Sequence, residues 1–475
     1  MKDIQVYTAL DAKVKPAEAL DILVLSTEGA AEMQTFNDLE DIKKAFKGKK
    51  VAALVDRMFN QDHTLADTLI RRVRLVGIEN PQNAGGKVST IAATFSGLKT
   101  NEELAAETSY YAKLGGKSVV EITTGDTAPE DEAAFAALFA GKTFTEDGVT
   151  FTATVEGAVV TFTSSTRTAI SGYTESIGLY KDADCFEDLE LGGASVVVTV
   201  GYKDTTKAEN LVAAIQALRD INDDWYIFLS DVTDEACVTA LCAWAESTEP
   251  TEAALGAGVE DHRKFYFGQT SNKKYVNTYG RSAVVYSEHP TEEWADAAWV
   301  GCVGPFWPES VTWKWKVPDK VAVADLRDSE RDTLETNFVN FMTAEYKHEY
   351  MKNGICGDGN FIDNVMGADY ITYQMRENLY NIFLANPKIG YTDAGFAIVA
   401  SGVYAALNRA VDLHIIAKDP ESDTGVYVVT IPKRAAATDE QVRNRIMPDI
   451  KWEAQLEGAV HGVKVSGVLR VTLNG

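Results

Sequence analysis

Residues 224–247 read DWYIFLSDVTDEACVTALCAWAES, an apolar run followed by a helix-forming stretch. This alternation of strand and helix extends from residue 194 to 304. The other segments expected in it are the strand ASVVVTV (194–200), the helix TTKAENLVAAIQALRDI (205–221), the strands RKFYFGQT (263–270) and SAVVYSE (282–288), and the helix TEEWADAAWVGCVG (291–304). Thr206 and Glu209 have the spacing of a capping box at the start of one helix. Continuous apolar strands alternating with helices predict an α/β core with a mostly parallel sheet covered on both faces.

The same core is expected to begin near the N-terminus. Its first elements are the strand ALDILVLST (19–27), the amphipathic helix FNDLEDIKKAFKG (36–48), the segment KKVAALVDRMFN (49–60) and a second strand near RRVRLVGI (71–78). The sequence therefore predicts a core whose two parts are separated in the chain by the segment 86–190.

Residues 86–190 differ in composition, because they are rich in Thr, Gly and Ala and contain 17 acidic against 7 basic residues. The stretch KTFTEDGVTFTATVEGAVVTFTSST (142–166) predicts three strands separated by Asp147-Gly148, a strong hairpin signal, and by Glu156-Gly157. A helix is expected before them, with Thr127 and Glu130 at capping-box spacing. We interpret this region as an inserted α+β or β-rich domain.

The composition limits the classes of function. The 475 residues are enough for two to four domains, and the formal net charge of −25 argues against a nucleic-acid or anionic-membrane surface. The five cysteines are scattered without a CxxC motif, which suits a reducing compartment. No signal region is evident at the N-terminus, and charged residues interrupt the apolar stretch 396–413. We expect a soluble intracellular protein in which 396–413 is a core helix.

Several short motifs imitate known sites. GGKS (115–118) and GKT (141–143) lack the glycine that a phosphate loop needs five positions before its second glycine. The loop GICGDGNFIDN (354–364) does not match the ligand spacing of a calcium loop, and we interpret it as a tight turn between helices. No HExxH or GxSxG motif occurs. The sequence therefore nominates no catalytic, cofactor-binding or metal-binding residue. In GPFWPESVTWKWK (304–316) the tryptophans favour packing between domains over ligand stacking, with Trp313 and Trp315 expected on one face.

Both ends of the chain have the pattern of a strand. Residues 456–475 read LEGAVHGVKVSGVLRVTLNG, and from Gly462 onward apolar and polar residues alternate, as in a strand with one buried face. The apolar positions are Val463, Val465, Leu469, Val471 and Leu473. A shorter alternation near the N-terminus comprises Ile4, Val6, Thr8 and Leu10.

The last third of the chain resembles a known family. Four segments show the resemblance. The first is WKWK (313–316), and the second is a helix expected near ETNFVNF (335–341), with Asn337 and Asn340. The third is GDGNFID, which precedes a long helix, and the fourth is PKIGYTDAG, which begins the next helix. The ending RNRIMPDIKWEAQLEGAVHGVKVSGVLRV (443–471) fits the same order. Together these segments resemble the C-terminal region of contractile tail sheath proteins of myophage-like particles, closest to a branch grouped as phage proteins of unknown function. The resemblance covers 310–475 well, the α/β middle loosely, and the inserted segment hardly at all.

This resemblance implies a structural role without an enzymatic activity or a cofactor. Sheath subunits stack as rings around a tube and contract to drive it through a cell envelope, without consuming nucleotide. Their N- and C-terminal arms add strands to a neighbour's sheet, which is the role implied for the two alternating ends. The implied partners are other copies of the chain, a tube protein, and baseplate and terminator proteins, with no nucleic acid and no insertion into a membrane. The implied location is a virion tail, assembled in the bacterial host cytoplasm.

The division of the chain that we expect has six parts. They are an N-terminal arm (1–20), a first part of the core (21–85), an inserted domain on the outer surface of the particle (86–190), the rest of the core (191–320), a C-terminal α+β domain (321–460) and a C-terminal arm (461–475). Two other functions remain open: an α/β enzyme, either a hydrolase or a nucleotide-binding protein, and another tail or baseplate component.

Residues 431–475 hold seven basic and five acidic residues, against the acidic balance of the whole chain. Lys433, Arg434, Arg443 and Arg445 concentrate this charge. If the C-terminal domain is innermost, as in related sheaths, these residues face an acidic tube. A solvated helix end with charges suited to the helix dipole explains them equally well.

Overall fold

The chain is described from a computed structural model. The described residues are 20–61, 69–97, 104–114, 118–146, 148–170, 177–180, 193–251, 254 and 262–465. They form two compact units, one from residues Met1–Pro81 with Leu211–Gly475 and the other from Gln82–Asn210. Each unit is described by itself below.

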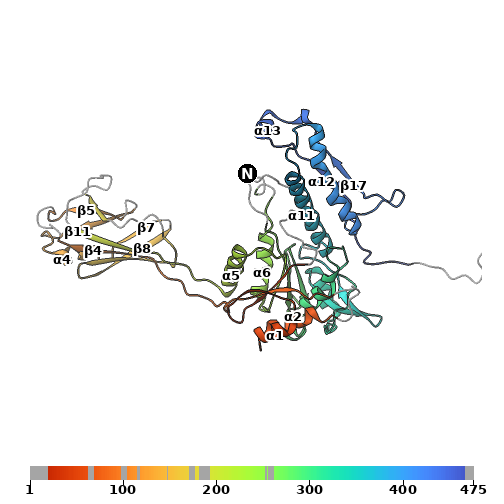
Figure 1. The fold of residues 1–475 in the computed structure, drawn as a ribbon. Coiled ribbons are helices and arrows are strands. Elements are labelled where there is room, and N and C mark those ends of the chain that lie inside the picture. Colours follow the sequence, from red (N-terminus) through yellow and green to blue (C-terminus); the bar gives the residue numbers. More distant parts are fainter. Residues whose placement is uncertain are drawn as a thin grey trace, which may run out of the picture. The chain divides into compact units, whose positions relative to one another are not determined.

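The larger unit is built on an eight-stranded sheet with the order β16-β15-β14-β13-β12-β1-β3-β2 (Figure 1). Its strands are β1 (Ile22–Ser26), β2 (Ala31–Phe36), β3 (Val73–Gly77), β12 (Ile227–Ser230), β13 (Phe265–Thr270), β14 (Ser282–Tyr286), β15 (Asn340–Glu345) and β16 (His348–Lys352). The six strands from β15 to β3 pair in parallel, and the antiparallel strands β16 and β2 form the edges. The sheet is therefore mostly parallel, as the apolar runs predict. Strand β2 was not expected.

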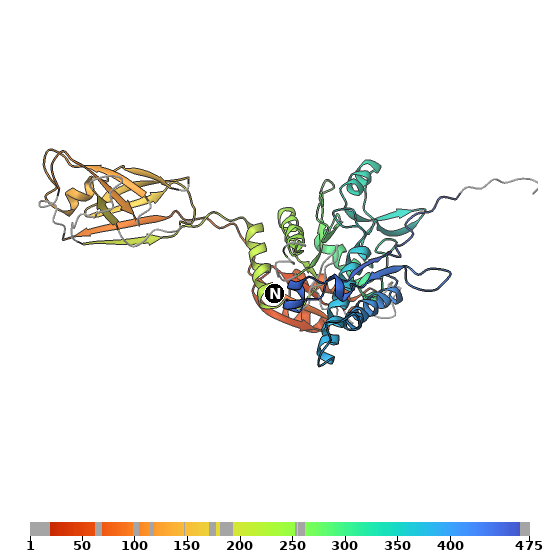
Figure 2. The ribbon, with the colours of Figure 1, turned by 90° about the horizontal axis from the view of Figure 1, so that it is seen from above.

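Helices cover both faces of this sheet (Figures 1 and 2). On one face lie α1 (Leu39–Ala45), α2 (Lys50–Phe59) and α9 (Ala295–Val303); on the other lies α6 (Glu235–Ser247), against which α5 (Lys207–Ile221) packs. Alternation along β12 illustrates the two layers, because Phe228 packs edge-on against Trp244 of α6 while Leu229 belongs to the core under α2 and α9. Gly301 allows α9 to approach α2, since a Cβ there would lie 2.2 Å from the Met58 carbonyl oxygen.

The sheet extends further along the chain than the sequence predicts. The expected C-terminal domain began at residue 321, but β15 pairs with β14, so the core continues to Lys352. The helix expected to include Asn337 and Asn340 is α10 (Asp328–Thr336), and it stops earlier, because Phe338 has a left-handed φ of 55°. Asn340 instead opens β15, where its amide donates to the carbonyl oxygens of Val284 and Ile355.

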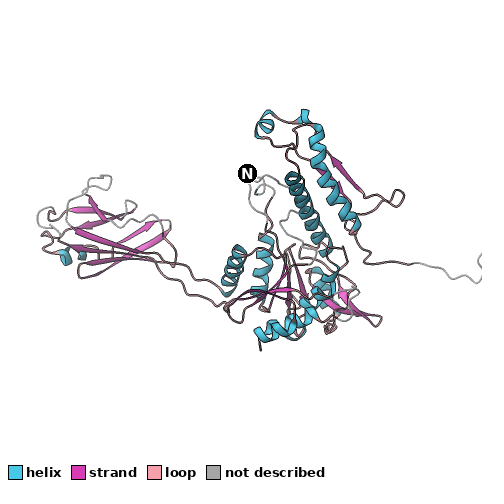
Figure 3. Ribbon diagram, viewed as in Figure 1, coloured by secondary structure: helices cyan, strands magenta, loops and turns pink. Residues whose placement is uncertain are grey.

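In the part that the structure describes, the smaller unit contains two antiparallel sheets and the short helix α4 (Figure 3). The five-stranded sheet has the order β11-β4-β9-β8-β7 and the three-stranded sheet the order β10-β5-β6. The elements are β4 (Thr90–Ser96), β5 (Ser109–Leu114), β6 (Ser118–Thr123), α4 (Glu132–Ala137), β7 (Thr143–Glu146), β8 (Val149–Glu156), β9 (Val159–Ser164), β10 (Ile177–Tyr180) and β11 (Gly193–Thr199). The hairpin glycines Gly148 and Gly157 have the positive φ that such turns require.

Three expectations for this region need correction. The unit runs from residue 82 to 210, not from 86 to 190. The run expected as a core strand at 194–200 is β11, whose backbone pairs with β4 inside the smaller unit. The cap of α4 is Asp131, whose carboxylate accepts from the Ala134 amide, and not Thr127. The capping box of α5 is confirmed, since Thr206 and Glu209 exchange backbone-to-side-chain hydrogen bonds.

The C-terminal part of the larger unit is a helical hairpin with a small β-ribbon. The long helices α11 (Ile362–Ala385) and α12 (Asp393–Asp412) lie side by side (Figure 3). The ribbon comprises β17 (Tyr427–Thr430) and β18 (Lys451–Ala454), joined through the 3-10 turn η2 (Arg434–Ala436) and α13 (Asp439–Asn444).

Helix α12 matches the apolar stretch that the sequence singled out. Among the described helices it alone has the length and apolar composition of a membrane span, and half of that stretch is buried inside the structure. Its buried face includes Val403 and Leu407, which share a core with Met375 of α11. These contacts agree with the expected core helix.

Candidate assembly interface

The β-ribbon is the least complete sheet in the described structure. It has two strands, and one of its faces packs on the helical hairpin through Val429 of β17 and Trp452 of β18. On the other face Val428 is 65% exposed. A two-stranded sheet is marginally stable by itself, and a third strand would complete it. In the described residues the ribbon is extended at one end by two isolated bridges, Ile416 with Leu456 and Lys418 with Gly425.

After β18 the chain remains attached to the unit for a few residues and then leaves it. The Gln455 amide donates to the Val426 carbonyl oxygen, and the Glu457 amide donates to that of Ile415, both at 3.0 Å. The last described side-chain contact belongs to His461, whose Nε2 lies 2.6 Å from Thr312 Oγ1. The described chain beyond it makes no such contact up to residue 465.

The predicted arm residues fall only partly within the described residues. Val463 and Val465 are 84% and 85% exposed, and residues 462–465 pair with no strand of the described structure. The other predicted positions lie outside the described residues: Leu469, Val471 and Leu473 at the C-terminal end, and Ile4, Val6, Thr8 and Leu10 at the N-terminal end. Two valines at this exposure leave apolar surface in contact with water, which is a cost that another surface can remove.

The four basic residues lie on one connection between β17 and β18, and all four are exposed. The Arg434 guanidinium lies over the Tyr391 ring, 5.3 Å from its centroid. Arg443 Nε donates to the Asp439 carbonyl oxygen within α13. Arg445 caps α13 in a left-handed conformation with φ of 58°. The structure therefore places Lys433 with these three on one short segment.

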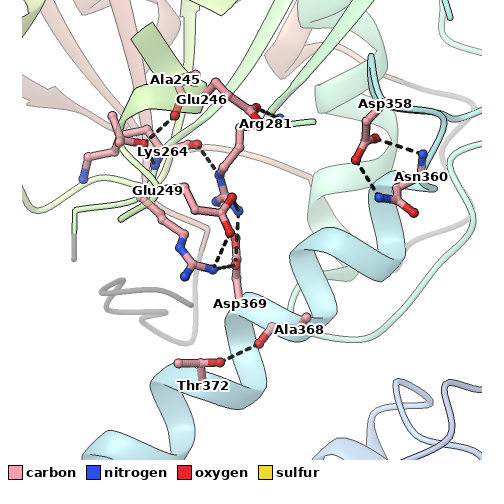
Figure 4. Close-up of polar contacts among 12 residues, drawn as sticks. Ala245, Glu246, Glu249, Lys264, Arg281, Asp358, Asn360, Ala368, Asp369 and Thr372 are labelled. Carbon is pink, nitrogen blue, oxygen red and sulfur yellow. Dashed lines mark hydrogen bonds and ion pairs between the residues drawn. The ribbon is translucent and has the colours of Figure 1, made fainter. Parts of the chain in front are cut away.

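A buried charge cluster, which the sequence analysis did not identify, attaches α11 to the sheet (Figure 4). Asp369 of α11 accepts from Arg281 Nη2 at 2.5 Å, from Arg263 Nη1 at 3.2 Å and from the Tyr226 hydroxyl at 2.7 Å. Glu249 lies 3.5 Å from Arg263 and 3.7 Å from Arg281. The three donors come just before β13, β14 and β12, whose amino ends meet at one edge of the sheet.

Electrostatics within this cluster favour the ionised pair. Burial by itself would raise the pKa of Asp369, but the charges of Arg281 and Arg263 hold that pKa below its ordinary value. Burial, together with the neighbouring Asp369 carboxylate, raises the pKa of the Tyr226 hydroxyl, which therefore stays a neutral donor. The signal available in the sequence was one carboxylate, Asp369, inside the otherwise apolar stretch VMGADYITY (365–373).

At the opposite edge of the sheet, where ligands bind in doubly wound folds, a carboxylate is held by the chain's own groups. Strands β1 and β12 are neighbours there, and the Asp231 carboxylate that follows β12 accepts from Ser26 Oγ at 3.0 Å. It also accepts from the Thr27 amide at 2.9 Å and the Thr27 hydroxyl at 2.7 Å. Burial raises the pKa of Asp231. This carboxylate therefore links the ends of β12 and β1 through hydrogen bonds.

Two of the other motifs have structural roles, whereas GGKS (115–118) lies outside the described residues except for Ser118. GKT (141–143) joins α4 to β7, so it precedes a strand, whereas a phosphate loop opens a helix. The loop 354–364 is a tight turn, with φ of 75° at Gly354 and 85° at Gly359, but it joins β16 to α11 and not two helices. Within the described ranges no three His, Cys, Asp or Glu side chains are grouped as metal ligands.

The tryptophans pack differently from the expectation. Trp313 is buried against Phe267 and Trp299, whereas Trp315 is 44% exposed and packs on Tyr350. They do not share a face, because a φ of 66° at Trp315 turns the chain out of the extended conformation. Beside Trp307 lies a cavity of about 30 Å³, lined mainly by apolar residues. That volume suits about one water molecule.

Comparison with known proteins gives likenesses in structure alone. No protein-family model matches the sequence, and no curated protein matches it. The helical sheath of the anti-feeding prophage in the contracted state is 11% identical, with a TM-score of 0.49 over 98% of this chain and 99% of that chain. A sheath tail protein from Desulfitobacterium hafniense is 12% identical, with a TM-score of 0.41 over 90% and 93%. A structure of the anti-feeding prophage baseplate is 14% identical, with a TM-score of 0.42 over 57% and 76%. At these values the description of the fold rests on the chain's own topology.

Proposed function

We propose that this chain is a structural subunit of a contractile tail sheath. Copies assemble as stacked rings around a tail tube and shorten to drive the tube through a cell envelope, without nucleotide hydrolysis. The proposed partners are other copies, the tube protein, and baseplate and terminator proteins. The proposed location is the tail of a virion or phage-like particle assembled in the bacterial host cytoplasm. The proposal rests on the resemblance of residues 310–475 to sheath proteins and on the geometry of the ribbon and the chain end.

One observation carries the proposal: Val463 and Val465, in the described chain that follows the two-stranded ribbon, are 84% and 85% exposed. Val463 and Val465 have the two-residue spacing of a strand with one apolar face. If this segment paired with a sheet edge through main-chain hydrogen bonds, both valines would pack against the neighbouring subunit. The C-terminal arm (461–475) then adds a strand, from residue 462 onward, to the ribbon of a neighbouring copy. The N-terminal alternation at Ile4, Val6, Thr8 and Leu10 is proposed to do the same.

The basic connection between β17 and β18 is proposed to face the tube. Lys433, Arg434, Arg443 and Arg445 are exposed together, and opposite charge on a tube would favour association at low salt. The connection is fastened near both of its ends, since the Arg434 amide donates to Asp393 Oδ1 at 2.5 Å and the Tyr391 hydroxyl donates to the Ile446 carbonyl oxygen at 2.8 Å. A held, exposed set of cations suits a contact surface.

The acidic inserted unit is proposed to lie on the outer surface of the particle. Its own core of buried aromatic residues is separate from that of the larger unit, so it does not need the lattice in order to fold. Deleting residues 85–204, and joining through a short glycine linker the flanks that the Ala84–Thr205 bridge brings together, retains α5 with its capping box and should leave assembly intact. A folded deletion variant that never forms tubes would contradict this placement.

An enzymatic role would require a polar pocket at the carboxyl edge of the sheet. The Asp231 carboxylate at that edge is already held by Ser26 and Thr27, which favours the structural role.

Truncation after His461 tests the proposed function. The described part of the arm contributes no buried surface to its own subunit, so the truncated chain should remain a folded monomer with an unchanged melting temperature. It should form no tubes when the intact protein does, as seen by negative-stain electron microscopy. An unfolded product, or tubes formed by the truncated chain, would contradict strand donation.

A further inference from the structure

We propose that Thr312, Lys314, Phe361 and His461 form a clamp that fixes the root of the C-terminal arm, so that only the residues after His461 transfer to a neighbour. This inference rests on the proposed strand donation and deepens it, because it states where the transferable segment begins. The clamp is a positioning device, and its residues make no contact with the neighbour in the proposal.

Three contacts from two separate segments converge on His461. Its Nε2 lies 2.6 Å from Thr312 Oγ1, and its carbonyl oxygen accepts from Lys314 Nζ at 3.1 Å. Its ring packs edge-on against the Phe361 ring, with centroids 4.6 Å apart and planes at 88°. Phe361 is the residue before α11, and Thr312 and Lys314 lie in the segment that leads out of the core beside Trp313. Both segments belong to the larger unit.

The neighbours of His461 in the sequence show that these contacts are local. Val460 and Val463 are 82% and 84% exposed, whereas His461 is half-buried. His461 is therefore an anchor point: its side chain and backbone are held, while the chain on either side of it is exposed. Burial, assisted by the Lys314 charge, lowers the pKa of His461, which favours the neutral ring that can accept from the Thr312 hydroxyl.

Fixing the root limits the reach of the arm. Val463 is two residues beyond the clamp, so the receiving edge must begin within about 7 Å of it. Because a slip of one residue turns every side chain to the opposite face, a fixed root also specifies the register in which the valines are buried.

The first test removes the clamp and retains the arm. His461→Ala and the double variant Thr312→Val/Phe361→Ala should keep the melting temperature of the monomer within about 2 °C, while raising the protein concentration needed for half-maximal assembly about 3- to 10-fold. His348→Ala, at an exposed histidine of β16, is the matched control and should assemble as the intact chain does. Assembly of both clamp variants at the concentration of the intact chain would overturn the proposal.

The second test asks whether the root stays in place during assembly. A reducible thiol-specific cross-linker that joins Thr312→Cys to His461→Cys replaces the side-chain contact with a covalent link, and it spans the space that the imidazole ring fills. The cross-linked double variant should still form tubes, because only the residues beyond the link move. Tubes that form only after reduction would show that the segment before the arm must detach, which would overturn the proposal.

A third measurement uses the monomer, so that its result is independent of assembly. The NMR titration of His461 should give a pKa below 6.5, rising towards that value in Phe361→Ala. A His461 that titrates like an exposed histidine in the intact monomer would overturn the clamp. Failure of the truncation after His461 to abolish assembly would instead contradict strand donation, so the two failures can be told apart.

Discussion

The amino edge of the parallel sheet and the β17–β18 ribbon place polar and apolar groups in opposite ways. At the sheet edge, Asp369 is 1% exposed and every charge around it has a partner of opposite sign. At the ribbon, Val428 is 65% exposed and the chain end that follows carries two valines that are more exposed still. The first region is finished within one chain. The second would gain a further strand in the proposed assembly.

This difference separates stability from assembly. A buried ionic cluster contributes to the folding of its own chain, because removing one partner leaves an uncompensated charge. Exposed apolar residues contribute nothing to the fold of their own chain, and they become favourable contacts only on a second surface. Variants at the sheet edge should therefore lower the stability of the monomer. Variants in the chain end should leave that stability unchanged and prevent assembly of the particle.

The largest expected effect is on assembly, in a variant that leaves the monomer unchanged. Replacing Val463 and Val465 with Asp places two charges where a neighbour's sheet would bury them, at a cost of several kcal/mol for each copy of the contact. Tube formation should be lost in electron micrographs, and the melting temperature should stay within about 1 °C. Lys464→Ala, on the polar face, is the control and should assemble. Tubes formed by the double variant would show that assembly does not depend on burial of these valines, and would contradict the assignment of the chain end to assembly.

The next largest effect is on stability. Asp369→Ala leaves Arg263 and Arg281 buried without their carboxylate, and should lower the free energy of unfolding by about 3–5 kcal/mol. Asp412→Ala, at the exposed end of α12, is the matched control, expected within about 0.5 kcal/mol of the intact chain. Urea denaturation of the monomer measures both. A loss below about 1 kcal/mol for Asp369→Ala would show that the amino edge does not depend on this cluster.

The parts of this fold that were predictable are those set by local pattern. The Thr206–Glu209 capping box was correct because its two hydrogen bonds depend on three residues of spacing. The parallel sheet was predictable because strands buried on both faces must be continuously apolar. Both signals are complete within a short stretch of sequence.

The parts that were missed depend on distant partners. β11 is an apolar run that resembles a core strand, and only its pairing with β4, about a hundred residues earlier in the chain, assigns it to the inserted unit. Asn340 ends a helical pattern because it satisfies the carbonyl groups of Val284 and Ile355 from the start of a strand. Asp369 signalled a buried charge, but nothing local to it identified Arg281 and Arg263 as its partners.

A smaller effect, dependent on pH, is expected at Asp296, a buried residue in the first turn of α9. Burial raises its pKa from 3.8 to about 7, and its Oδ2 has no hydrogen-bond partner in the described structure. Because the folded pKa exceeds the unfolded value, the folded state holds the proton more tightly. Stability is therefore highest below pH 4 for this group and falls as the pH rises to about 7.

Asp296→Asn should remove this dependence. The variant's gain in melting temperature over the intact chain should be small at pH 4 and grow until about pH 7. The exposed Asp332→Asn is a control that should show no such trend. A gain that is constant with pH would mean that Asp296 is not held protonated. The carboxylate would then be as well paired in the core beneath α9 as Asp369 is at the amino edge of the sheet.

The smallest expected effect concerns the basic connection, which belongs to the assembly region but is already well ordered. Reversing charge at Arg443 and Arg445 to Glu should weaken tube-templated assembly about 3- to 10-fold at low salt, and the difference should shrink as salt screens the surfaces. Arg445 has a left-handed backbone, so the control is Arg443→Gln with Arg445→Asn, since Asn tolerates that conformation. The neutral control should show an intermediate loss if charge is the cause. Equal co-assembly of all three proteins at every salt concentration would assign these residues to a solvated helix end, and would leave the arm as the part of this region that recognises another molecule.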